Sequence, residues 1–216
     1  MNTYIFDFDG TLVDSMPYWS EGMISIIKKA NVAYPDDIIK IITPLGTIGT
    51  AKYLKEALGV SFEIDEILKM MNDYTLPKYR DIIPVKKGVY DYLKHLKQKG
   101  KSINMLTANS HNVMDACLKR VNIFDMFDNV WSTDDFNMSK SNPQIYKEAL
   151  KRIGTTNEDT VFFDDNIVAV KTAKEAGLKT VGVYDETGCD FKDELEKISD
   201  LYINSFLETD KLKVFE

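Results

Sequence analysis

Alternation of helical and extended segments along the second half of the chain restricts the possible folds more than any other feature. From Val85 onward, apolar residues switch repeatedly between helical spacing and short continuous runs. The expected strands are Ser102–Leu106, Asn129–Ser132, Thr160–Phe163 and Lys179–Val183, and the expected helices are Gly88–Lys99, Val113–Val121, Pro143–Ile153 and Ile167–Ala176. Strands that are separated by helices pair in parallel and are covered on both faces. We therefore predict an α/β fold with a parallel sheet.

A further buried strand is predicted almost at the beginning of the sequence, from the apolar run Tyr4-Ile5-Phe6. Asp7 and Asp9 follow this run, and side chains two residues apart on extended backbone point to the same side. Gly10 permits a sharp turn directly after them. Because close carboxylates are costly without a cation between them, the pattern favours a metal-assisted site. A plain surface turn is the alternative, since Asp-Gly is a common turn dipeptide.

Between these two parts lies a segment without a convincing strand pattern. Helices are expected after Ser15, over Asp36–Ile42, over Gly49–Leu58 and over Glu63–Tyr79, with a Gly-containing loop at Thr43–Gly49. This segment resembles an insertion, so we predict an all-helical domain of residues 15–84 within a core of residues 1–14 and 85–216. The hinges are expected near Val13–Ser15 and Ile82–Val85.

Composition excludes several classes of function. A net charge of −7 and a pI of about 5.0 argue against a nucleic-acid partner, because no basic patch is concentrated anywhere. No apolar run reaches the ~18 residues of a membrane span, and no signal-peptide pattern is visible. Cys117 and Cys189 are far apart and match no metal-binding spacing. A cytoplasmic protein with reduced cysteines is the expectation.

Polar residues occur where the predicted strands end. Asp7 and Asp9 follow the first strand, Thr107 the second, and Asp164-Asp165 a later one. Ligands of parallel α/β sheets bind beyond the carboxyl ends of the strands, where the strand order reverses. These residues are therefore expected to share one site.

Four short motifs in this order carry a family resemblance. They are Asp7-x-Asp9-x-Thr11, Thr107 at the end of an apolar strand, Lys140 followed by Ser141-Asn142-Pro143, and Asp164-Asp165 after Val161-Phe162-Phe163. On these residues the chain resembles the haloacid dehalogenase-like hydrolase superfamily, in its phosphatase and β-phosphoglucomutase-like branch. The resemblance spans nearly the whole chain. It implies a Rossmann-like core with a helical cap inserted after the first motif.

The resemblance also implies an activity: Mg²⁺-dependent hydrolysis of a small phosphorylated metabolite, such as a sugar phosphate, a phosphoglycolate-like acid or a nucleoside monophosphate. Asp7 would be the nucleophile that forms an aspartyl-phosphate, and Asp9 the general acid and base. The remaining implied roles are Mg²⁺ binding by Asp7, the Asp9 carbonyl, Asp164 and above all Asp165; phosphate binding by Thr107, Ala108 and Lys140; and substrate selection by the cap residues Tyr18 and Gly46. A monomer or a homodimer is expected.

Other interpretations stay open at this point. Taken singly, Thr107 is an ordinary strand-end hydroxyl, Lys140 a solvated lysine, and Asp164-Asp165 a helix N-cap pair. β-Phosphoglucomutases share the implied fold, but Thr11 and the absence of arginine from Thr43–Thr50 favour a hydrolase. Phosphonoacetaldehyde hydrolases use a cap lysine, for which Lys28 and Lys29 are in a suitable region. Asp9 argues against a true dehalogenase, and a non-catalytic relative that binds phosphorylated ligands is a further alternative.

Overall fold

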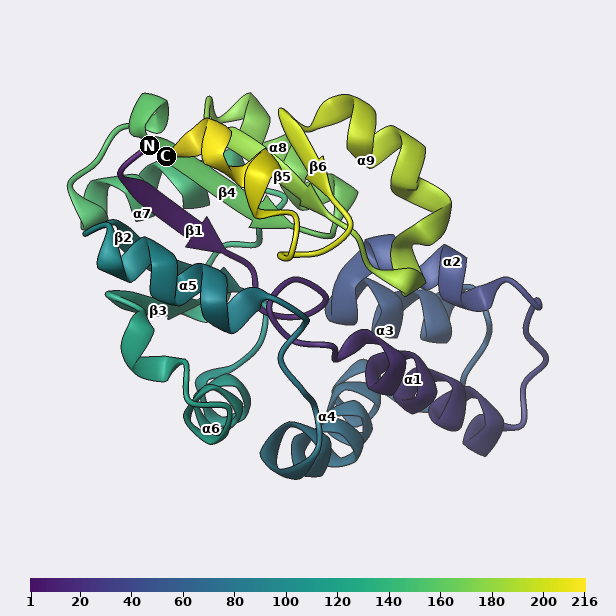
Figure 1. Ribbon diagram of the computed structural model, residues 1–216. Coiled ribbons are helices and arrows are strands. Elements are labelled where there is room, and N and C mark those ends of the chain that lie inside the picture. The colour runs from purple at the N-terminus through teal and green to yellow at the C-terminus, as the bar shows by residue number, and fades with distance from the viewer.

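The computed structural model describes all residues from 1 to 216, and its centre is one parallel sheet. The six strands lie in the order β3-β2-β1-β4-β5-β6 (Figure 1). Their bounds are β1 (Thr3–Phe6), β2 (Ser102–Thr107), β3 (Asn129–Ser132), β4 (Thr160–Asp164), β5 (Lys179–Val183) and β6 (Leu201–Ile203). The predicted parallel α/β sheet is confirmed. The prediction lacked β6, the edge strand, which pairs with β5 alone.

Strand β1 lies in the middle of the sheet, where the strand order reverses. It pairs with β2 on one side, Phe6 opposite Met105, and with β4 on the other, Phe6 opposite Phe163. This register brings the carboxyl ends of the three strands to one edge. The backbone N–H of Asp7 extends the pairing by donating to the carbonyl of Phe163 at 2.8 Å.

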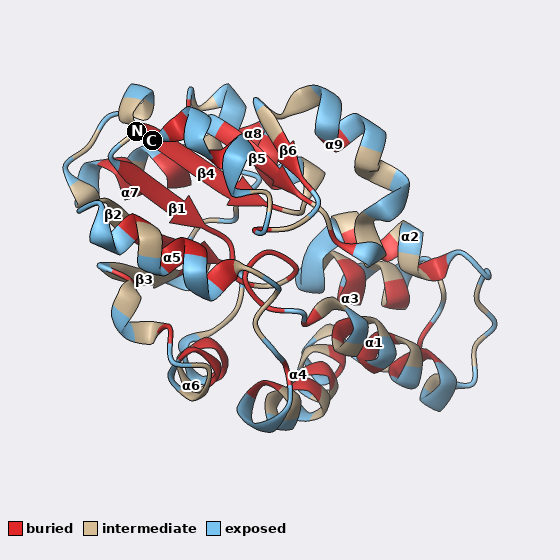
Figure 2. Ribbon diagram, viewed as in Figure 1, coloured by how far each residue is buried: buried red, intermediate tan, exposed pale blue.

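Helices cover both faces of the sheet. Phe6 and its neighbours on one face pack against α5 (Val89–Gln98), α6 (His111–Arg120) and the C-terminal α10 (Thr209–Leu212). Ile5 and its neighbours on the other face pack against α7 (Pro143–Ile153) and α8 (Ile167–Glu175). Side chains alternate along a strand, so a continuous apolar run supplies both cores. Figure 2 shows the strands almost wholly buried between helices that expose their outer faces.

The remaining elements of this part are short. Helix α9 (Lys192–Ile198) packs against α8 and β6 through the cluster of Val170, Leu195 and Tyr202. Six 3₁₀ turns occur in the chain: η1 (Thr43–Leu45), η2 (Phe124–Met126), η3 (Thr133–Phe136), η4 (Asn157–Asp159), η5 (Glu186–Phe191) and η6 (Lys213–Phe215). The two ends of the chain lie side by side, and the N-terminal ammonium donates to the carbonyl of Phe215 at 2.6 Å (Figure 1).

The segment after β1 is all helical, as predicted, and has a core of its own. It contains α1 (Met16–Ala30), α2 (Ile38–Ile42), α3 (Gly46–Glu56) and α4 (Ile64–Asp81). Trp19 and Met23 are buried in this second core, so they are packing residues of the helical part. A reciprocal capping box between Glu63 and Glu66 begins α4. The division into domains at 14/15 and 84/85 stays a prediction.

The prediction of a loop at Thr43–Gly49 is wrong. Thr43–Leu45 forms the 3₁₀ turn η1, and α3 begins directly at Gly46. Gly46 has φ +64°, a conformation in which glycine lacks the steric cost of a side chain. One glycine thus redirects the backbone between two helical stretches, where the sequence suggested an open loop.

Two linkers join the helical part to the sheet and run beside each other. Val13 and Val85 form an antiparallel bridge. The N–H of Asp14 donates to the carbonyl of Pro84 at 3.0 Å, and that of Lys86 to the carbonyl of Leu12 at 2.9 Å. Arg120 of α6 donates to the carbonyl of Tyr79 in the last turn of α4 and to that of Ile83 in the linker. Since both linkers share hydrogen bonds, a movement at one is coupled to the other.

A second contact between the two parts does not involve the linkers. The turn η5, which follows β5, packs against α1, α2 and η1. Lys40 of α2 and Asp190 of η5 form an ion pair at 3.3 Å.

No helix of the structure combines the length and apolar character that a membrane span needs.

Candidate active site

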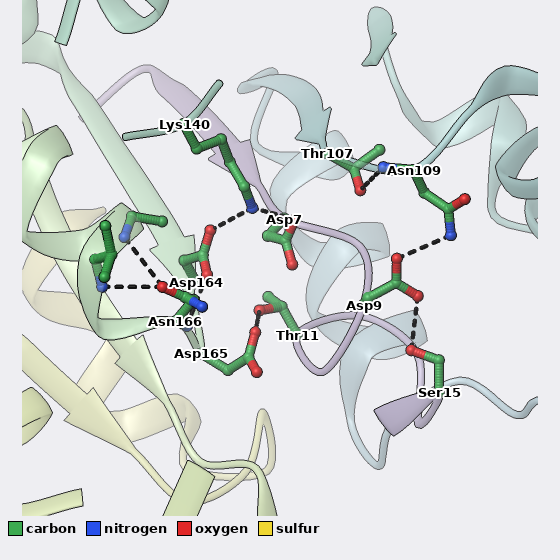
Figure 3. Close-up of polar contacts among 12 residues, drawn as sticks. Asp7, Asp9, Thr11, Ser15, Thr107, Asn109, Lys140, Asp164, Asp165 and Asn166 are labelled. Carbon is green, nitrogen blue, oxygen red and sulfur yellow. Dashed lines mark hydrogen bonds and ion pairs between the residues drawn. The ribbon is translucent and has the colours of Figure 1, made fainter. Parts of the chain in front are cut away.

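Lys140 links two carboxylates at the carboxyl edge of the sheet. Its Nζ lies 2.5 Å from Oδ1 of Asp7 and 2.7 Å from Oδ2 of Asp164 (Figure 3). The three side chains are almost fully buried, with exposed fractions of 13%, 6% and 0%. Lys140 is placed by the loop before α7, because the hydroxyl of Tyr146 lies 3.0 Å from the Lys140 carbonyl. The interpretation of Lys140 as a solvated surface lysine is therefore wrong.

Asp165 completes an acidic cluster with Asp7 and Asp164. One carboxylate oxygen from each of the three lies within 4.8 Å of the others. The hydroxyl of Thr11 donates to Oδ1 of Asp165 at 3.3 Å, and the N–H of Asn166 donates to Oδ1 of Asp164 at 2.8 Å. Hard carboxylate oxygens that converge in this way are the ligands that Mg²⁺ prefers. The three residues fit a site for that ion. The capping of α8 belongs to Asn166, whose side chain accepts from Val168 and Ala169, and not to the acidic pair.

Asp9 faces a different set of partners from Asp7. Its Oδ1 accepts hydrogen bonds from the hydroxyl of Ser15 at 2.6 Å and from the hydroxyl of Tyr79 at 2.5 Å. Its Oδ2 accepts from the side-chain amide of Asn109 at 3.0 Å. Figure 3 shows the Asp9 carboxylate turned toward Asn109 and Ser15 and away from the acidic cluster. The two carboxylates after β1 therefore have different surroundings, as different chemical roles would require.

Thr107 and Ala108 lie at the end of β2, on the same edge of the sheet. Thr107 is buried, and its hydroxyl accepts from the backbone N–H of Asn109 at 3.1 Å, whereas Ala108 is exposed. The two predicted cap residues, Tyr18 and Gly46, form no hydrogen bond with the carboxylates of the site. Tyr18 is half-buried and packs against the core that surrounds the sheet, and a Cβ added at Gly46 would meet nothing within 4 Å. Their roles stay predictions.

Burial and neighbouring charges set the ionisation of this site. Burial raises the pKa of Asp7 to about 8, although the Lys140 ammonium acts against the rise. Burial would lower the pKa of Lys140, but Asp164 and Asp7 outweigh it and raise that pKa, so the lysine stays charged. Burial also raises the pKa of Asp9, against the effect of its hydrogen bonds from Ser15, Tyr79 and Asn109. The pKa of Asp165 is raised well above its usual range by burial and by the charges of Asp164 and Asp185.

Several partners in this site were absent from the sequence analysis. Tyr79 reaches Asp9 from the last turn of α4, whereas in the sequence it marked only the end of an expected helix. Asn109, which donates to Asp9, follows Thr107 by two residues and carried no assigned role. Lys86 and Asp185, which lie beside the turn at Gly10, carried no signal at all. Tyr79 and Lys86 do not lie at the end of a strand, so neither sequence spacing nor the strand-end rule places them near the site.

His111 connects the loop after β2 to the turn η3. Its two ring nitrogens lie 3.3 Å from Asp115 and 2.9 Å from Asp135. The hydrogen bond with Asp135 raises the pKa of His111 above its ordinary value, with Asp115 adding to the effect and burial opposing it. A histidine whose pKa is raised on folding stabilises the protein below the unfolded pKa, and this contribution is lost as the pH rises through the folded pKa.

We expect His111→Asn to lower the melting temperature by on the order of 1–3 °C near pH 5.5, because the half-exposed pair is screened by solvent. The difference from wild type should vanish near pH 8.5, where His111 is neutral in both states. Thermal unfolding of both proteins at the two pH values is the measurement. An equal difference at both pH values would show that His111 acts by packing and not by charge.

Comparison with known proteins gives the site its context. Residues 4–183 match the haloacid dehalogenase-like hydrolase family. Among curated proteins, the chain is 24% identical over 181 residues to "Phosphorylated carbohydrates phosphatase" of Thermotoga maritima, covering 84% of each chain. It is 29% identical over 180 residues to "Pyrophosphatase PpaX" of Bacillus velezensis, covering 83% of this chain and 81% of the relative.

A similar solved structure is a β-phosphoglucomutase from Clostridium difficile, with a TM-score of 0.80 over 100% of this chain and 98% of that one. Its sequence identity is 17%, so the likeness concerns the fold alone. The matches confirm the predicted Rossmann-like fold with its helical insert, and they confirm a hydrolytic enzyme among relatives named as phosphatases. The chain belongs to the haloacid dehalogenase-like hydrolase family.

Proposed function

We propose that this protein is a Mg²⁺-dependent phosphatase that hydrolyses a small phosphorylated metabolite through an aspartyl-phosphate on Asp7. The observation that carries the proposal is the buried contact of Lys140 with Asp7 and Asp164, with Asp165 beside them. A carboxylate approaching a phosphate dianion is repelled unless positive charge is held close to both. The cluster supplies one fixed ammonium and a set of oxygens suited to a divalent cation.

In the first step, an oxygen of the Asp7 carboxylate attacks phosphorus, and the bond between phosphorus and the leaving oxygen breaks. Asp9, protonated at the start, donates its proton to the leaving oxygen, which departs as an alcohol or acid. The raised pKa of Asp9 favours the protonated form that this step requires. The products of the step are the free leaving group and an acyl phosphate on Asp7.

In the second step, water attacks the phosphorus of the acyl phosphate, and the bond to the Asp7 oxygen breaks. Asp9, now a carboxylate, accepts a proton from the attacking water. Inorganic phosphate leaves, and both side chains return to their initial states. Lys140, the hydroxyl of Thr107 and the backbone N–H of Ala108 are the groups proposed to hold the phosphoryl oxygens during both steps.

The proposed Mg²⁺ ligands are carboxylate oxygens of Asp7 and Asp165, the backbone carbonyl of Asp9, and Asp164 directly or through water. When bound, the ion supplies positive charge that offsets repulsion between the carboxylates and the phosphate. The side chain of Asp9 stays separate from the proposed metal ligands in this arrangement, because its carboxylate accepts hydrogen bonds from Ser15, Tyr79 and Asn109.

A panel of sugar phosphates, phosphoglycolate, nucleoside monophosphates, pyrophosphate and p-nitrophenyl phosphate tests the function. We expect phosphate release from p-nitrophenyl phosphate and from at least one metabolite. Removal of divalent ions with EDTA should stop the release, because the repulsion between carboxylates and phosphate then has too little compensation, and Mg²⁺ should restore it. Full activity after complete removal of metal would overturn the proposal. Ca²⁺ is the matched control, since it prefers more ligands at longer distances.

The helical part is proposed to select the substrate, because its linkers lie next to the site and can move together. Tyr18→Ala should then lower activity on the preferred metabolite more than on p-nitrophenyl phosphate, whose leaving group needs little recognition. Tyr34, which packs only within the helical core, provides a control in Tyr34→Ala. Equal losses on both substrates would remove Tyr18 from the selection of substrate. Gly46 is a poor target for substitution, since any side chain at φ +64° is strained.

Phosphoryl transfer of the β-phosphoglucomutase type is the second candidate, favoured by the shared fold with the Clostridium difficile enzyme. Thr11 and an arginine-free Thr43–Thr50 stretch support the hydrolase instead. Incubation with β-glucose 1-phosphate and a catalytic amount of the bisphosphate separates the two. Free phosphate or no reaction agrees with the hydrolase, and efficient formation of glucose 6-phosphate would establish the mutase.

A further inference from the structure

Lys86 lies in the linker that returns from the helical part to the sheet, and its ammonium is enclosed by three acceptors. Nζ donates to the carbonyl of Gly10, to the carbonyl of Tyr184 at 2.8 Å, and to Oδ2 of Asp185 at 2.8 Å. The side chains of Lys86 and Asp185 are 17% and 3% exposed. An ammonium has three N–H donors, so this arrangement satisfies all of them and compensates for the loss of water.

The acceptors belong to separate segments of the chain. Gly10 is the residue after the two carboxylates of β1, and Tyr184 and Asp185 follow β5 at the same edge of the sheet. The backbone N–H of Lys86 also donates to the carbonyl of Leu12 at 2.9 Å. Lys86 therefore holds the turn at Gly10–Leu12 from two directions and ties it to the end of β5.

Asp185 is itself fixed, which makes it a firm anchor. Its Oδ1 accepts from the N–H and the hydroxyl of Thr187, at 3.0 and 2.6 Å, and this begins the turn η5. Both oxygens of the carboxylate are thus occupied. The buried pair of Lys86 and Asp185 therefore connects the linker to a carboxylate that is buried and already hydrogen-bonded at the end of β5, and not to a surface group.

The turn that Lys86 holds is packed directly against the acidic cluster. A Cβ at Gly10 would overlap the carboxylate of Asp165, and the hydroxyl of Thr11 donates to that carboxylate. A displacement of the turn by a fraction of an ångström would therefore change the position of Asp9 and Thr11 relative to Asp165. Metal sites and phosphoryl-transfer sites are sensitive to displacements of this size.

We propose that Lys86 is a positioning residue for phosphoryl transfer, which fixes the Gly10 turn against the Mg²⁺ site by binding it to Tyr184 and Asp185. The inference rests on the proposed function, since it assigns Lys86 to the same site. Lys86 acts through the backbone of the turn and does not touch the reacting phosphate.

A role in position and a role in charge predict opposite effects on Mg²⁺ affinity. Lys86→Met removes a positive charge from the neighbourhood of three carboxylates, and this change alone would tighten binding of a cation. It also leaves the Gly10 carbonyl without its side-chain donor, so the turn loosens and the site becomes less well formed. Loss of a group that orients metal ligands typically weakens metal binding by about 10–100-fold. If position dominates, binding weakens.

Isothermal titration calorimetry with MgCl₂ on wild type, Lys86→Met and Lys87→Met measures this directly. Lys87 is the neighbouring lysine in the same linker, it is exposed, and its side chain forms no hydrogen bond or ion pair. We expect the Mg²⁺ dissociation constant of Lys86→Met to rise about tenfold, with Lys87→Met unchanged. The kcat for p-nitrophenyl phosphate at saturating Mg²⁺ should fall by about tenfold with KM within a factor of about three, as expected for a loss of alignment.

Equal or tighter Mg²⁺ binding by Lys86→Met would overturn the proposal. If Lys86→Met does not fold, as judged by circular dichroism, Lys86→Gln takes its place. The shorter glutamine amide cannot reach all three acceptors, so its Mg²⁺ dissociation constant should rise in the same way. Measurements on the wild-type protein distinguish a failure of the proposed function from a failure of the role of Lys86. A wild type that neither binds Mg²⁺ nor releases phosphate overturns the proposed function and this role with it, whereas an active wild type with an unaffected Lys86→Met overturns only the role of Lys86.

Discussion

Asp7→Asn should reduce phosphate release by about 10⁴-fold or more on every substrate, a loss of ~5.5 kcal/mol of transition-state stabilisation. Asparagine has nearly the same shape as aspartate but lacks the anionic oxygen that attacks phosphorus, so the covalent step cannot occur. The substitution should leave the fold intact, because Asp7 follows β1 and the pairing of its N–H with Phe163 uses only backbone atoms. Steady-state assays with p-nitrophenyl phosphate, together with circular dichroism, are the measurements.

Asp14→Asn is the matched control for this prediction. Asp14 follows the same strand, is exposed, and pairs with Pro84 through its backbone N–H alone. It should retain activity within about a factor of two, since surface substitutions of this kind change little. Mass spectrometry of acid-quenched enzyme should detect a phosphorylated peptide around Asp7 in wild type and none in Asp7→Asn. Activity of Asp7→Asn within about tenfold of wild type, only ~1.4 kcal/mol of barrier, would contradict the nucleophile assignment.

The sheet could be predicted from the sequence because each buried strand is short, apolar and flanked by helices. The predicted bounds of β3, α7 and β5 agree with the structure. A strand buried on both faces needs apolar side chains at consecutive positions, and that pattern is visible without knowledge of its neighbours. Strand β6 (Leu201–Ile203) was not predicted although its three residues are apolar, because its place in the sheet comes from edge pairing with β5. Edge pairing depends on tertiary contacts that spacing does not encode.

The residues of the site also fall into a group that could be predicted from local sequence and a group that could not. Residues at strand ends were predicted because a parallel sheet brings all carboxyl ends to one edge, whatever the details of packing. The partners Tyr79 and Asp185 were not predicted, because their contacts depend on how α4 and the linkers dock against the sheet. Tyr79 is 70 residues from Asp9 in sequence, and Asp185 is 99 residues from Lys86. Contacts at such separations follow from the complete fold and not from local propensity.

The carboxylates of Asp7, Asp164, Asp165 and Asp185 also explain why two buried lysines occur near the site. Asp7 and Asp164 contact Lys140, and Asp185 contacts Lys86, while Asp165 has Thr11 as its hydrogen-bond partner. Burying a carboxylate without compensation is costly, so each ammonium offsets part of that cost. The two lysines are not equivalent. Lys86 donates hydrogen bonds to two backbone carbonyls as well, whereas the hydrogen bonds of the Lys140 ammonium go to carboxylates alone.

Lys140→Met should therefore have the second largest effect on catalysis, a loss of about 10³-fold in kcat/KM, or ~4 kcal/mol. The ammonium is the only side-chain cation in contact with Asp7, and without it negative charge that develops on the phosphoryl oxygens is stabilised less. Lys147→Met is the control, because Lys147 lies on the exposed side of α7 in the same region of the chain. It should behave like wild type.

The same substitution should strengthen the response to Mg²⁺ while it removes activity. In the proposed site, Lys140 would compete with a divalent cation for the oxygens of Asp7 and Asp164, so its removal would free both carboxylates and leave more negative charge for the ion. Without Mg²⁺, these two buried carboxylates have lost their partner, and removing one member of a buried ion pair typically costs about 3–5 kcal/mol. The melting temperature of Lys140→Met should accordingly be lower than that of wild type in EDTA and should rise more steeply as MgCl₂ is added. Weaker Mg²⁺ binding by Lys140→Met would contradict this prediction. It would mean that Lys140 positions the carboxylates for the ion, the kind of role that is proposed here for Lys86, and does not compete with the ion.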